Sequence, residues 1–328
     1  MLDVLGCGDC PAGRAPFLAV DGSVRCPACA ANWPVGPHGA VNALTEPAES
    51  VVREIDGMRS EQPSRYPTRD SFLFQEVERV SRFEDRVAGE ERAGTKNYFR
   101  STELNFRYAF AKLGIRGTER VLEVGAEHDF PFLRSFQERG CECYATNLFF
   151  CYETGRPPGA QVVLGDMNRL PYRGESFDVV LLSATSHHSP DLRGLLAELA
   201  RVTRPGGHVL LLNDPTHGLL KHSLNRFKLG AKKGGDRHHL VNENEYSVAA
   251  YRRLAKAAGF DIVESFFSVY YDQQLREGRL TGVRFGPLAR LASLAWRVGP
   301  LRSLLKKAAL YPGQMLLGLE LNMVLRKR

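Results

Sequence analysis

The sequence reads GDMNRLPYRGESFDVVLL at residues 165–182, and this stretch decides the fold. It contains an acidic turn, a proline loop and an almost continuous apolar run. A second apolar run, HVLLL at residues 208–212, follows a helical segment that ends at Pro205-Gly206-Gly207. Short apolar strands that alternate with helices are typical of a parallel sheet covered on both faces. We therefore expect an α/β fold.

The same alternation continues outward from this stretch. Further strands are expected at RVLEVG (120–125), CECYATN (141–147), QVVLGD (161–166), FDIVESFFSVYY (260–271) and the end of the chain. Helices are expected at 97–113, 130–140, 189–202 and 243–259, where apolar residues recur at spacings of three and four. At 328 residues and 43% apolar content, the chain is long enough for such a core and for smaller additions.

This pattern resembles the class I S-adenosylmethionine-dependent methyltransferases, most specifically in GDMNRLPYRGESFDVVLL, in SHHSPD (186–191) and in ELARVTRPGGHVLLL (198–212). The resemblance implies a doubly wound, mostly parallel, seven-stranded sheet that binds S-adenosylmethionine at the carboxyl ends of its strands. It implies that Asp166 accepts the adenine amino hydrogen and that Ser183 or Ala184 offers a carbonyl to the methionine ammonium. The cofactor-binding residues implied in this way are Glu123, Gly125, Ala126, Asn147, Asp166, Met167, Ser183 and Ala184.

The first cofactor loop departs from the family's acid-x-Gly-x-Gly-x-Gly pattern, because residues 123–129 read EVGAEHD. Glu127 and Asp129 replace two glycines, and we expect their charges to disfavour the carboxylate of the cofactor. The acid that holds the ribose hydroxyls in the family is here Asn147. Two interpretations stay open: a working methyltransferase with a variant loop, or a scaffold or regulatory subunit whose crevice serves another ligand, including a divalent metal ion.

Three polar residues follow the fourth and fifth strands of the expected sheet. His187 and His188 come after the fourth strand, and Asp214 ends the fifth. The carboxyl ends of these strands share the edge where the family binds its methyl acceptor. A histidine there can accept the acceptor's proton at neutral pH, whereas packing within the fold is the alternative. We take these three residues as the candidate catalytic set.

Four of the seven cysteines lie within the first 29 residues, as two Cys-x2-Cys pairs. The pairs are Cys7 with Cys10 and Cys26 with Cys29, and the Asp21-Gly22 turn of a β-hairpin lies between them. This spacing favours a tetrahedral structural Zn2+ site over two disulfides or an iron–sulfur cluster.

The sequence around these cysteines resembles the zinc-ribbon family that includes the activator subunit of tRNA and release-factor methyltransferases. The resemblance covers residues 1–44 and rests on the four cysteines, Trp33-Pro34-Val35 and a later Gly-x-x-x-Leu. It implies a docking surface for a protein partner. A zinc ribbon before a methyltransferase body also resembles the rRNA guanine methyltransferases, but a dense mixture of basic and aromatic residues is missing, so nucleic acid is not favoured.

The charge of the chain is uneven. Residues 216–328 hold 20 Lys and Arg against 8 Asp and Glu, and residues 285–319 hold no acid. Basic amphipathic helices at 285–310 suit an anionic membrane surface, although the sequence favours packing against the body or a partner. The expected organisation is a zinc ribbon (1–44), a linker or helical arm (45–96), a methyltransferase-like core (97–271), a basic amphipathic insertion (272–315) and a final core strand (316–328).

These observations predict a cytoplasmic enzyme, because a membrane span and a secretory signal are not expected. The leading prediction is methyl transfer from S-adenosylmethionine to an oxygen or nitrogen of a small-molecule or glycan-type acceptor. The alternatives are the scaffold or regulatory subunit described above and an RNA methyltransferase.

Overall fold

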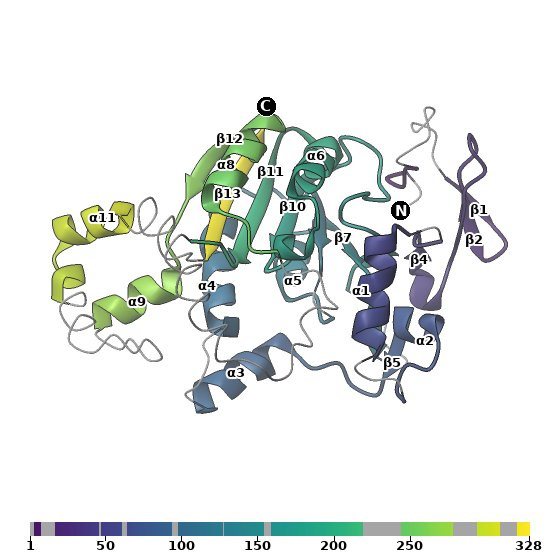
Figure 1. The fold of residues 1–328 in the computed structure, drawn as a ribbon, viewed down its shortest axis with the longest axis horizontal. Helices are drawn as coiled ribbons and strands as arrows, with labels where there is room; N and C mark the ends of the chain where they lie inside the picture. Colours follow the sequence, from purple (N-terminus) through teal and green to yellow (C-terminus); the bar gives the residue numbers. More distant parts are fainter. Residues whose placement is uncertain are drawn as a thin grey trace, which may run out of the picture.

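A large twisted sheet forms the centre of the molecule (Figure 1). The computed structural model describes residues 3–7, 17–45, 47–60, 64–93, 98–126, 128–153, 159–218, 244–277, 294–308 and 320–328. The strand order of the sheet is β12-β13-β11-β10-β6-β7-β9-β4. All neighbouring pairs are parallel except those of β13, which runs antiparallel to both β11 and β12.

The sheet confirms the expected α/β class. Its strands are β4 (Val41–Asn42), β6 (Arg120–Val124), β7 (Glu142–Asn147), β9 (Gln161–Leu164), β10 (Phe177–Ser183), β11 (Thr203–Asp214), β12 (Phe260–Ser265) and β13 (Leu321–Lys327). Strands β6 and β10 are almost entirely buried because helices cover both faces of the sheet.

The predicted count of seven strands was wrong, because the described residues alone form an eight-stranded sheet. The additional strand is β4, in which Val41 pairs with Val163 and Asn42 with Leu164 of β9. Strand β9 would otherwise be a sheet edge with unpaired N–H and C=O groups. A segment from the N-terminal part of the chain satisfies that edge, which the sequence pattern of the core does not predict.

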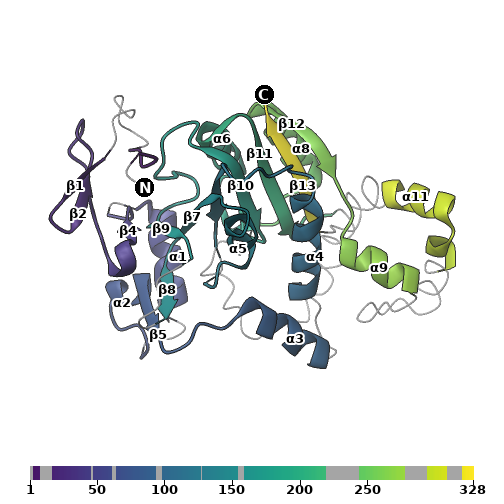
Figure 2. The same cartoon turned by 180° about the vertical axis from the view of Figure 1, so that it is seen from behind.

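Helices on the two faces create two apolar clusters (Figures 1 and 2). Helices α6 (Leu192–Val202) and α8 (Val248–Ala257) contribute to one cluster, and α4 (Tyr98–Phe110) and α5 (Pro131–Gln137) to the other. Asp191 caps the N-terminus of α6, because its side chain accepts a hydrogen bond from the N–H of Arg193 at 3.0 Å.

The N-terminal residues form a small antiparallel sheet of β1 (Leu18–Val20), β2 (Ser23–Arg25) and β3 (Asn32–Pro34). The rings of Phe17 and Trp33 stack with their centroids 4.4 Å apart. Both side chains belong to the same apolar cluster as helix α6. Residues 3–7 also contact the core, because Leu5 forms a bridge with Tyr172. The N-terminal sheet therefore packs on the core.

The arm expected at residues 45–96 contains ordered elements that extend from the N-terminal sheet to α3, which lies below α4 (Figure 2). These are α1 (Glu49–Ser60), α2 (Arg69–Leu73), β5 (Phe74–Val77) and α3 (Phe83–Ala93). Strand β5 pairs in parallel with β8 (Phe150–Glu153). Two short 3-10 helices are also present: Pro37–Gly39 precedes β4, and Ser186–His188 follows β10.

Two helices project from the opposite end of the molecule, α9 (Val269–Glu277) and α11 (Gly299–Ala308) (Figure 1). The strand predicted at 260–271 was too long, because β12 ends at Ser265 and α9 already begins at Val269. The rest of the two helices lies in the region predicted as a basic insertion, of which residues 278–293 and 309–315 lie outside the described residues. Over the part of the chain that is described, the helices are too short or too polar to cross a bilayer.

Candidate active site

A small cavity lies where the carboxyl ends of β6, β7 and β9 meet helix α1. The ends of these parallel strands reach the same edge of the sheet, so each strand contributes the residues that follow its last pair. The residues that line the cavity are Ser50, Val51, Glu54, Val124, Gly125, Thr146, Asn147, Leu148, Gly165, Asp166, Met167, Asn168, His188 and Pro190. From the sequence we expect the cofactor at this edge of the sheet.

Gly125 turns the chain sharply at the end of β6. Its φ is +72°, and its N–H donates a hydrogen bond to the carbonyl of Thr146 at 2.7 Å. A Cβ at this position would lie 2.3 Å from Cγ2 of Thr185. Both the backbone conformation and the contact require glycine. The retained glycine of the variant loop therefore has a structural reason.

Asn147 and Asp166 end neighbouring strands and make local contacts. The Asn147 side chain donates to the carbonyl of Ala126 at 2.9 Å and accepts from the N–H of Leu148 at 2.7 Å. Asp166 Oδ1 accepts from the N–H of Asn168 at 2.8 Å. Burial raises the pKa of the Asp166 carboxyl, and the bond from Asn168 opposes this shift.

The structure brings four of the eight predicted cofactor residues to the cavity: Gly125, Asn147, Asp166 and Met167. The other four are not among its lining residues: Glu123, Ala126, Ser183 and Ala184. Ser183 ends β10, and its Oγ accepts a hydrogen bond from Nδ2 of Asn213 at 3.1 Å. Ala184 follows with a φ of +48°. Ser183 and Ala184 therefore lie at the end of β10 without lining this cavity.

The three predicted catalytic residues lie close to one another. Nδ1 of His187 is 3.0 Å from Oδ1 of Asp214, and the backbone N–H of His187 donates to the same oxygen at 3.1 Å. The rings of His187 and His188 have centroids 4.1 Å apart. Asp214 is fully buried, so its contacts fix the orientation of the His187 imidazole.

Glu54 of α1 is a residue of the cavity that the sequence interpretation missed. Its side chain is buried, and Oε1 lies 3.8 Å from Nδ1 of His188. The available signal was the spacing of Val51 and Ile55, which places Glu54 on the buried face of a helix. The proline and charge content of residues 45–72 hid this pattern.

Asp129 has a role other than the one expected. Its Oδ2 accepts from the N–H of Phe83, the first residue of α3, at 2.6 Å, and Oδ1 lies 3.1 Å from Arg86 Nη2. The expectation that Asp129 repels the cofactor carboxylate is therefore corrected, because Arg86 compensates its charge and the helix start uses its second oxygen. Glu127, the other substituted position, lies outside the described residues.

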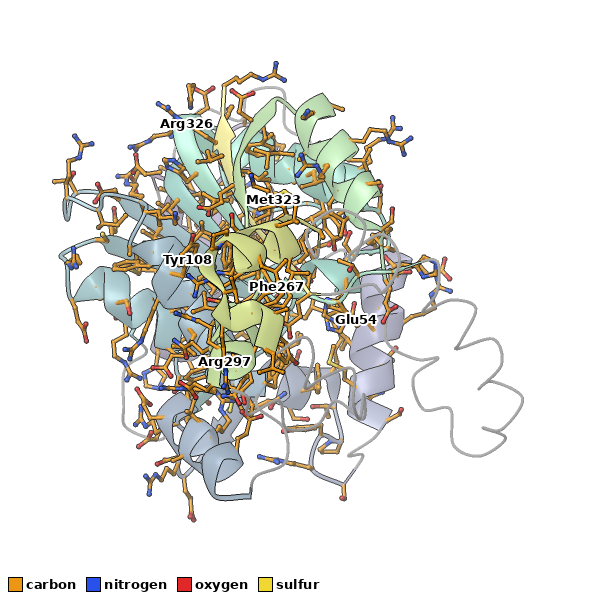
Figure 3. The ribbon with its side chains drawn as sticks, turned by 90° about the vertical axis from the view of Figure 1, so that its left-hand side faces the viewer. Glu54, Tyr108, Phe267, Arg297, Met323 and Arg326 are labelled. Carbon is orange, nitrogen blue, oxygen red and sulfur yellow. The ribbon has the colours of Figure 1, made fainter. Side chains whose placement is uncertain are left out.

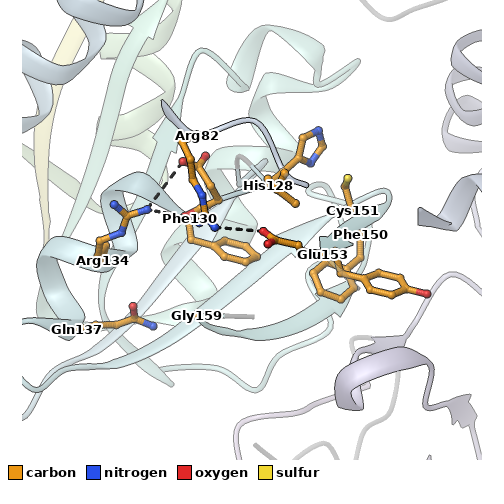
Figure 4. Close-up of a pocket in the computed structure, with 12 residues that line it drawn as sticks. Arg82, His128, Phe130, Arg134, Gln137, Phe150, Cys151, Glu153 and Gly159 are labelled. Carbon is orange, nitrogen blue, oxygen red and sulfur yellow. Dashed lines mark hydrogen bonds and ion pairs between the residues drawn. The ribbon is translucent and has the colours of Figure 1, made fainter. Parts of the chain in front are cut away.

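A second cavity, of about 210 Å³, is lined by residues 128–130 and by residues of β8 (Figure 4). Arg82 and Glu153 face each other in it at 3.1 Å, and Arg134 lies near Asp129 at 3.9 Å. Its charges therefore compensate one another within the wall, and this cavity shares none of the predicted cofactor residues.

Two of the predicted zinc ligands lie together at the N-terminal sheet. Sγ of Cys7 is 3.5 Å from Sγ of Cys29, close to the edge of about 3.8 Å that a tetrahedron with Zn–S bonds of about 2.3 Å would have. Cys26, which precedes Cys29 by three residues, is buried. Cys10 lies outside the described residues. Within the described part of the chain, no group of three or more metal-ligating side chains is assembled. The structure therefore does not show the zinc site.

Comparison with known proteins identifies the central part of the chain. Residues 130–211 match the family model described as a methyltransferase domain. This part of the chain is therefore similar to a methyltransferase domain, which supports an enzyme of the methyltransferase class. The phthiotriol/phenolphthiotriol dimycocerosates methyltransferase of Mycobacterium tuberculosis is 39% identical over 98 residues, which are 28% of this chain and 36% of the relative.

Two further proteins, one matched by sequence and one by structure, are also similar to this chain. The fatty-acid O-methyltransferase of Mycolicibacterium smegmatis is 35% identical over 123 residues, 34% of this chain and 44% of that protein. The chain thus spans less than half the length of these relatives. The crystal structure of an S-adenosylmethionine-dependent methyltransferase from Mesorhizobium loti aligns with a TM-score of 0.43 at 16% identity, covering 67% of this chain and 96% of that one.

Proposed function

We propose that the protein transfers a methyl group from S-adenosylmethionine to an oxygen or nitrogen of a small-molecule acceptor. The observation that carries this proposal is the cavity at the ends of β6, β7 and β9, where Gly125, Asn147 and Asp166 come together. The cavity lies in and beside the segment that matches the methyltransferase domain. Strand ends of a parallel α/β sheet are the usual place for such a ligand.

The residues of the cavity fit the chemical groups of the cofactor. Asp166 offers a carboxylate for the adenine amino group, and the Asn147 amide offers hydrogen bonds to the ribose. Gly125 lines the cavity with its backbone, since the side on which a Cβ would lie is occupied by Thr185. Asn147 carries no charge, but Glu54 contributes a buried carboxylate to the same cavity. Glu54 belongs to α1, which lies outside the matched segment. When bound, S-adenosylmethionine supplies an electrophilic methyl group.

In this proposal His187 takes the proton that the acceptor loses. Asp214 accepts a hydrogen bond from Nδ1, which leaves Nε2 of His187 as the proton acceptor. Asp214 thus acts as a positioning residue, and His188 contributes to the wall of the cofactor cavity beside Glu54. Holding the reactants in place supplies most of the expected rate enhancement.

The acceptor class is proposed from the relatives. Their names give phthiotriol or phenolphthiotriol dimycocerosates and a fatty acid as acceptors for those proteins. We extend this to the present chain as an apolar small molecule with a hydroxyl or carboxyl group. A glycan-type acceptor remains the alternative from the sequence.

Isothermal titration calorimetry with S-adenosylmethionine and S-adenosylhomocysteine tests the proposal directly. We expect the wild type to bind both and Asp166→Ala to bind about 5- to 150-fold more weakly, because a buried charged hydrogen-bond acceptor is lost. Asp261→Ala is the matched control, since Asp261 is an exposed acid on β12. If the wild type binds neither compound, the scaffold interpretation replaces this proposal.

We further propose a structural Zn2+ on Cys7, Cys10, Cys26 and Cys29. The contact between the sulfurs of Cys7 and Cys29 supports it. Elemental analysis of chelator-washed protein should find about one zinc ion per chain. Cys10→Ser should lower this content, whereas Cys151→Ala, a buried cysteine on β8, should not. Zinc-free protein that keeps its fold would contradict the site. A protein partner at this segment and a cytoplasmic location stay predictions.

A further inference from the structure

Helix α11 and the turn before it expose a row of apolar side chains. Leu294, Val298, Leu301 and Leu304 are 59%, 53%, 38% and 63% exposed. We call these four residues the α11 face. Leu301 and Leu304 are three residues apart and therefore lie on one side of α11, whereas Leu294 and Val298 belong to the short helical turn and the bend that precede it. None of the residues of α11 is buried. The alternative that the sequence favoured, packing of this face against the body, therefore does not describe these residues.

The opposite side of this segment is anchored to α9. Nε1 of Trp296 donates to Oδ1 of Asp272 at 2.8 Å, and Nζ of Lys306 lies 2.9 Å from the same oxygen. The Trp296 ring is buried and lies 5.6 Å from the ring of Phe267. Arg276 approaches the other oxygen of Asp272 at 3.0 Å.

This anchor fixes which side of the segment faces outward. Burial opposes ionisation of Asp272, but the Lys306, Trp296 and Arg276 contacts hold the pKa of its carboxyl below the usual range. The carboxylate therefore binds both helices at neutral pH. Rotation of α11 that buried Leu301 and Leu304 would break these contacts. The α11 face is thus held outward by the structure.

Cationic side chains accompany the α11 face. Arg297 and Lys307 are exposed and Arg302 is partly exposed. Figure 3 looks onto this end of the molecule and shows Arg297 on the projecting helices. The sequence has no Asp or Glu between residues 285 and 319. Exposed leucines bordered by Arg and Lys, without acids, are complementary to an anionic lipid surface.

We propose that the α11 face binds the surface of an anionic membrane, with its leucines in the acyl boundary and its basic residues at the lipid phosphates. A clustered apolar surface is uncommon on a monomeric soluble protein and usually marks an interaction site. The positive charge at its border favours lipid phosphates as the occupant over a neutral protein groove. The proposal is independent of methyl transfer, because it requires neither the cofactor nor the acceptor.

Vesicle co-sedimentation of the full-length protein tests the proposal. The probes are vesicles of phosphatidylcholine alone and vesicles in which about a quarter is phosphatidylglycerol. We expect binding to the anionic vesicles that weakens at least about fivefold as salt rises, since surface charges are screened. Leu301→Ser with Leu304→Ser should weaken it by at least about tenfold. Lys307→Glu should weaken it by about three- to tenfold.

Val263→Ser is the matched control. Val263 is 57% exposed on β12, away from the projecting helices, so this variant should bind as the wild type does. Circular dichroism and size-exclusion chromatography check that each variant keeps its fold. No binding to anionic vesicles, or equal loss in the control, would overturn the proposal. A self-association that the double leucine variant abolishes, without vesicle binding, would assign the face to a second copy instead.

Discussion

The N-terminal and C-terminal additions to the sheet differ in what they do with their apolar side chains. Residues 17–60 add a strand to the sheet and bury Trp33 and Ile55 in its two apolar clusters. Helices α9 and α11 project from the other end, and Leu301 and Leu304 stay exposed. Both additions contain amphipathic segments, so amphipathicity alone does not decide burial. The N-terminal addition is buried because β4 pairs with the edge strand β9. The C-terminal addition keeps its leucines outward because Asp272 binds Trp296 and Lys306 on its other side.

The largest expected effect separates a buried from an exposed apolar residue. Trp33→Ala should lower the free energy of unfolding by about 3–5 kcal/mol, because it removes a buried ring that stacks on Phe17. Leu304→Ala should change it by less than about 0.5 kcal/mol. Urea unfolding followed by circular dichroism measures both. Similar losses in the two variants would contradict the comparison.

Alanine substitutions at Gly125 in the crevice and at Gly299 in the projecting helix α11 should have opposite effects on stability. Gly125→Ala should cost about 2–4 kcal/mol and abolish cofactor binding, because of the positive φ and the contact with Thr185. Gly299→Ala should be neutral or stabilise by up to about 1 kcal/mol, since a Cβ there meets open space at the start of α11. Thermal unfolding and titration calorimetry distinguish the two results. A stable, cofactor-binding Gly125→Ala protein would show that the turn is not needed.

The junction between the core and α9 should respond to pH. Desolvation raises the pKa of Glu320 to about 7, although Ser101 Oγ donates to its Oε2 at 3.5 Å. The folded protein therefore keeps a proton that the unfolded chain loses above about pH 4.5, so stability falls as the pH rises from about 4.5 to 7. Glu320→Gln should remove this slope and add about 1–3 kcal/mol at pH 8. Unfolding curves across this pH range check it, and an unchanged slope would contradict it.

The smallest expected effect is confined to the projecting helices. Asp272→Asn should lower the local opening free energy of α11 by about 1 kcal/mol, because the charged contacts with Lys306 and Arg276 weaken. The pKa of Asp272 is lowered in the folded protein, so this contribution is present above the unfolded value and is lost as the pH falls below about 4. Hydrogen exchange of α11 measures it, with Asp261→Asn as control. Global destabilisation by Asp272→Asn would show that α11 belongs to the core.

Much of the core and part of the site could be predicted from the sequence. The apolar runs of β6 and β10 have the length and composition of strands buried on both faces, and strand ends meet at one edge. This logic placed Gly125, Asn147 and Asp166 in one crevice and His187 beside Asp214. Local pattern suffices there, because each residue follows directly from the strand that carries it.

Other features were decided only by tertiary structure. The pairing of Val41 with Val163 and the placement of Glu54 beside His188 join residues more than a hundred positions apart. The sequence gives such segments an apolar period, but the partner that buries it depends on which edge or face the folded core leaves open. The outward side of α11 is likewise set by the contacts of Asp272, a residue of another helix. The sequence by itself therefore determined the sheet and its strand-end crevice, and packing between distant segments determined what covers the crevice and what remains exposed.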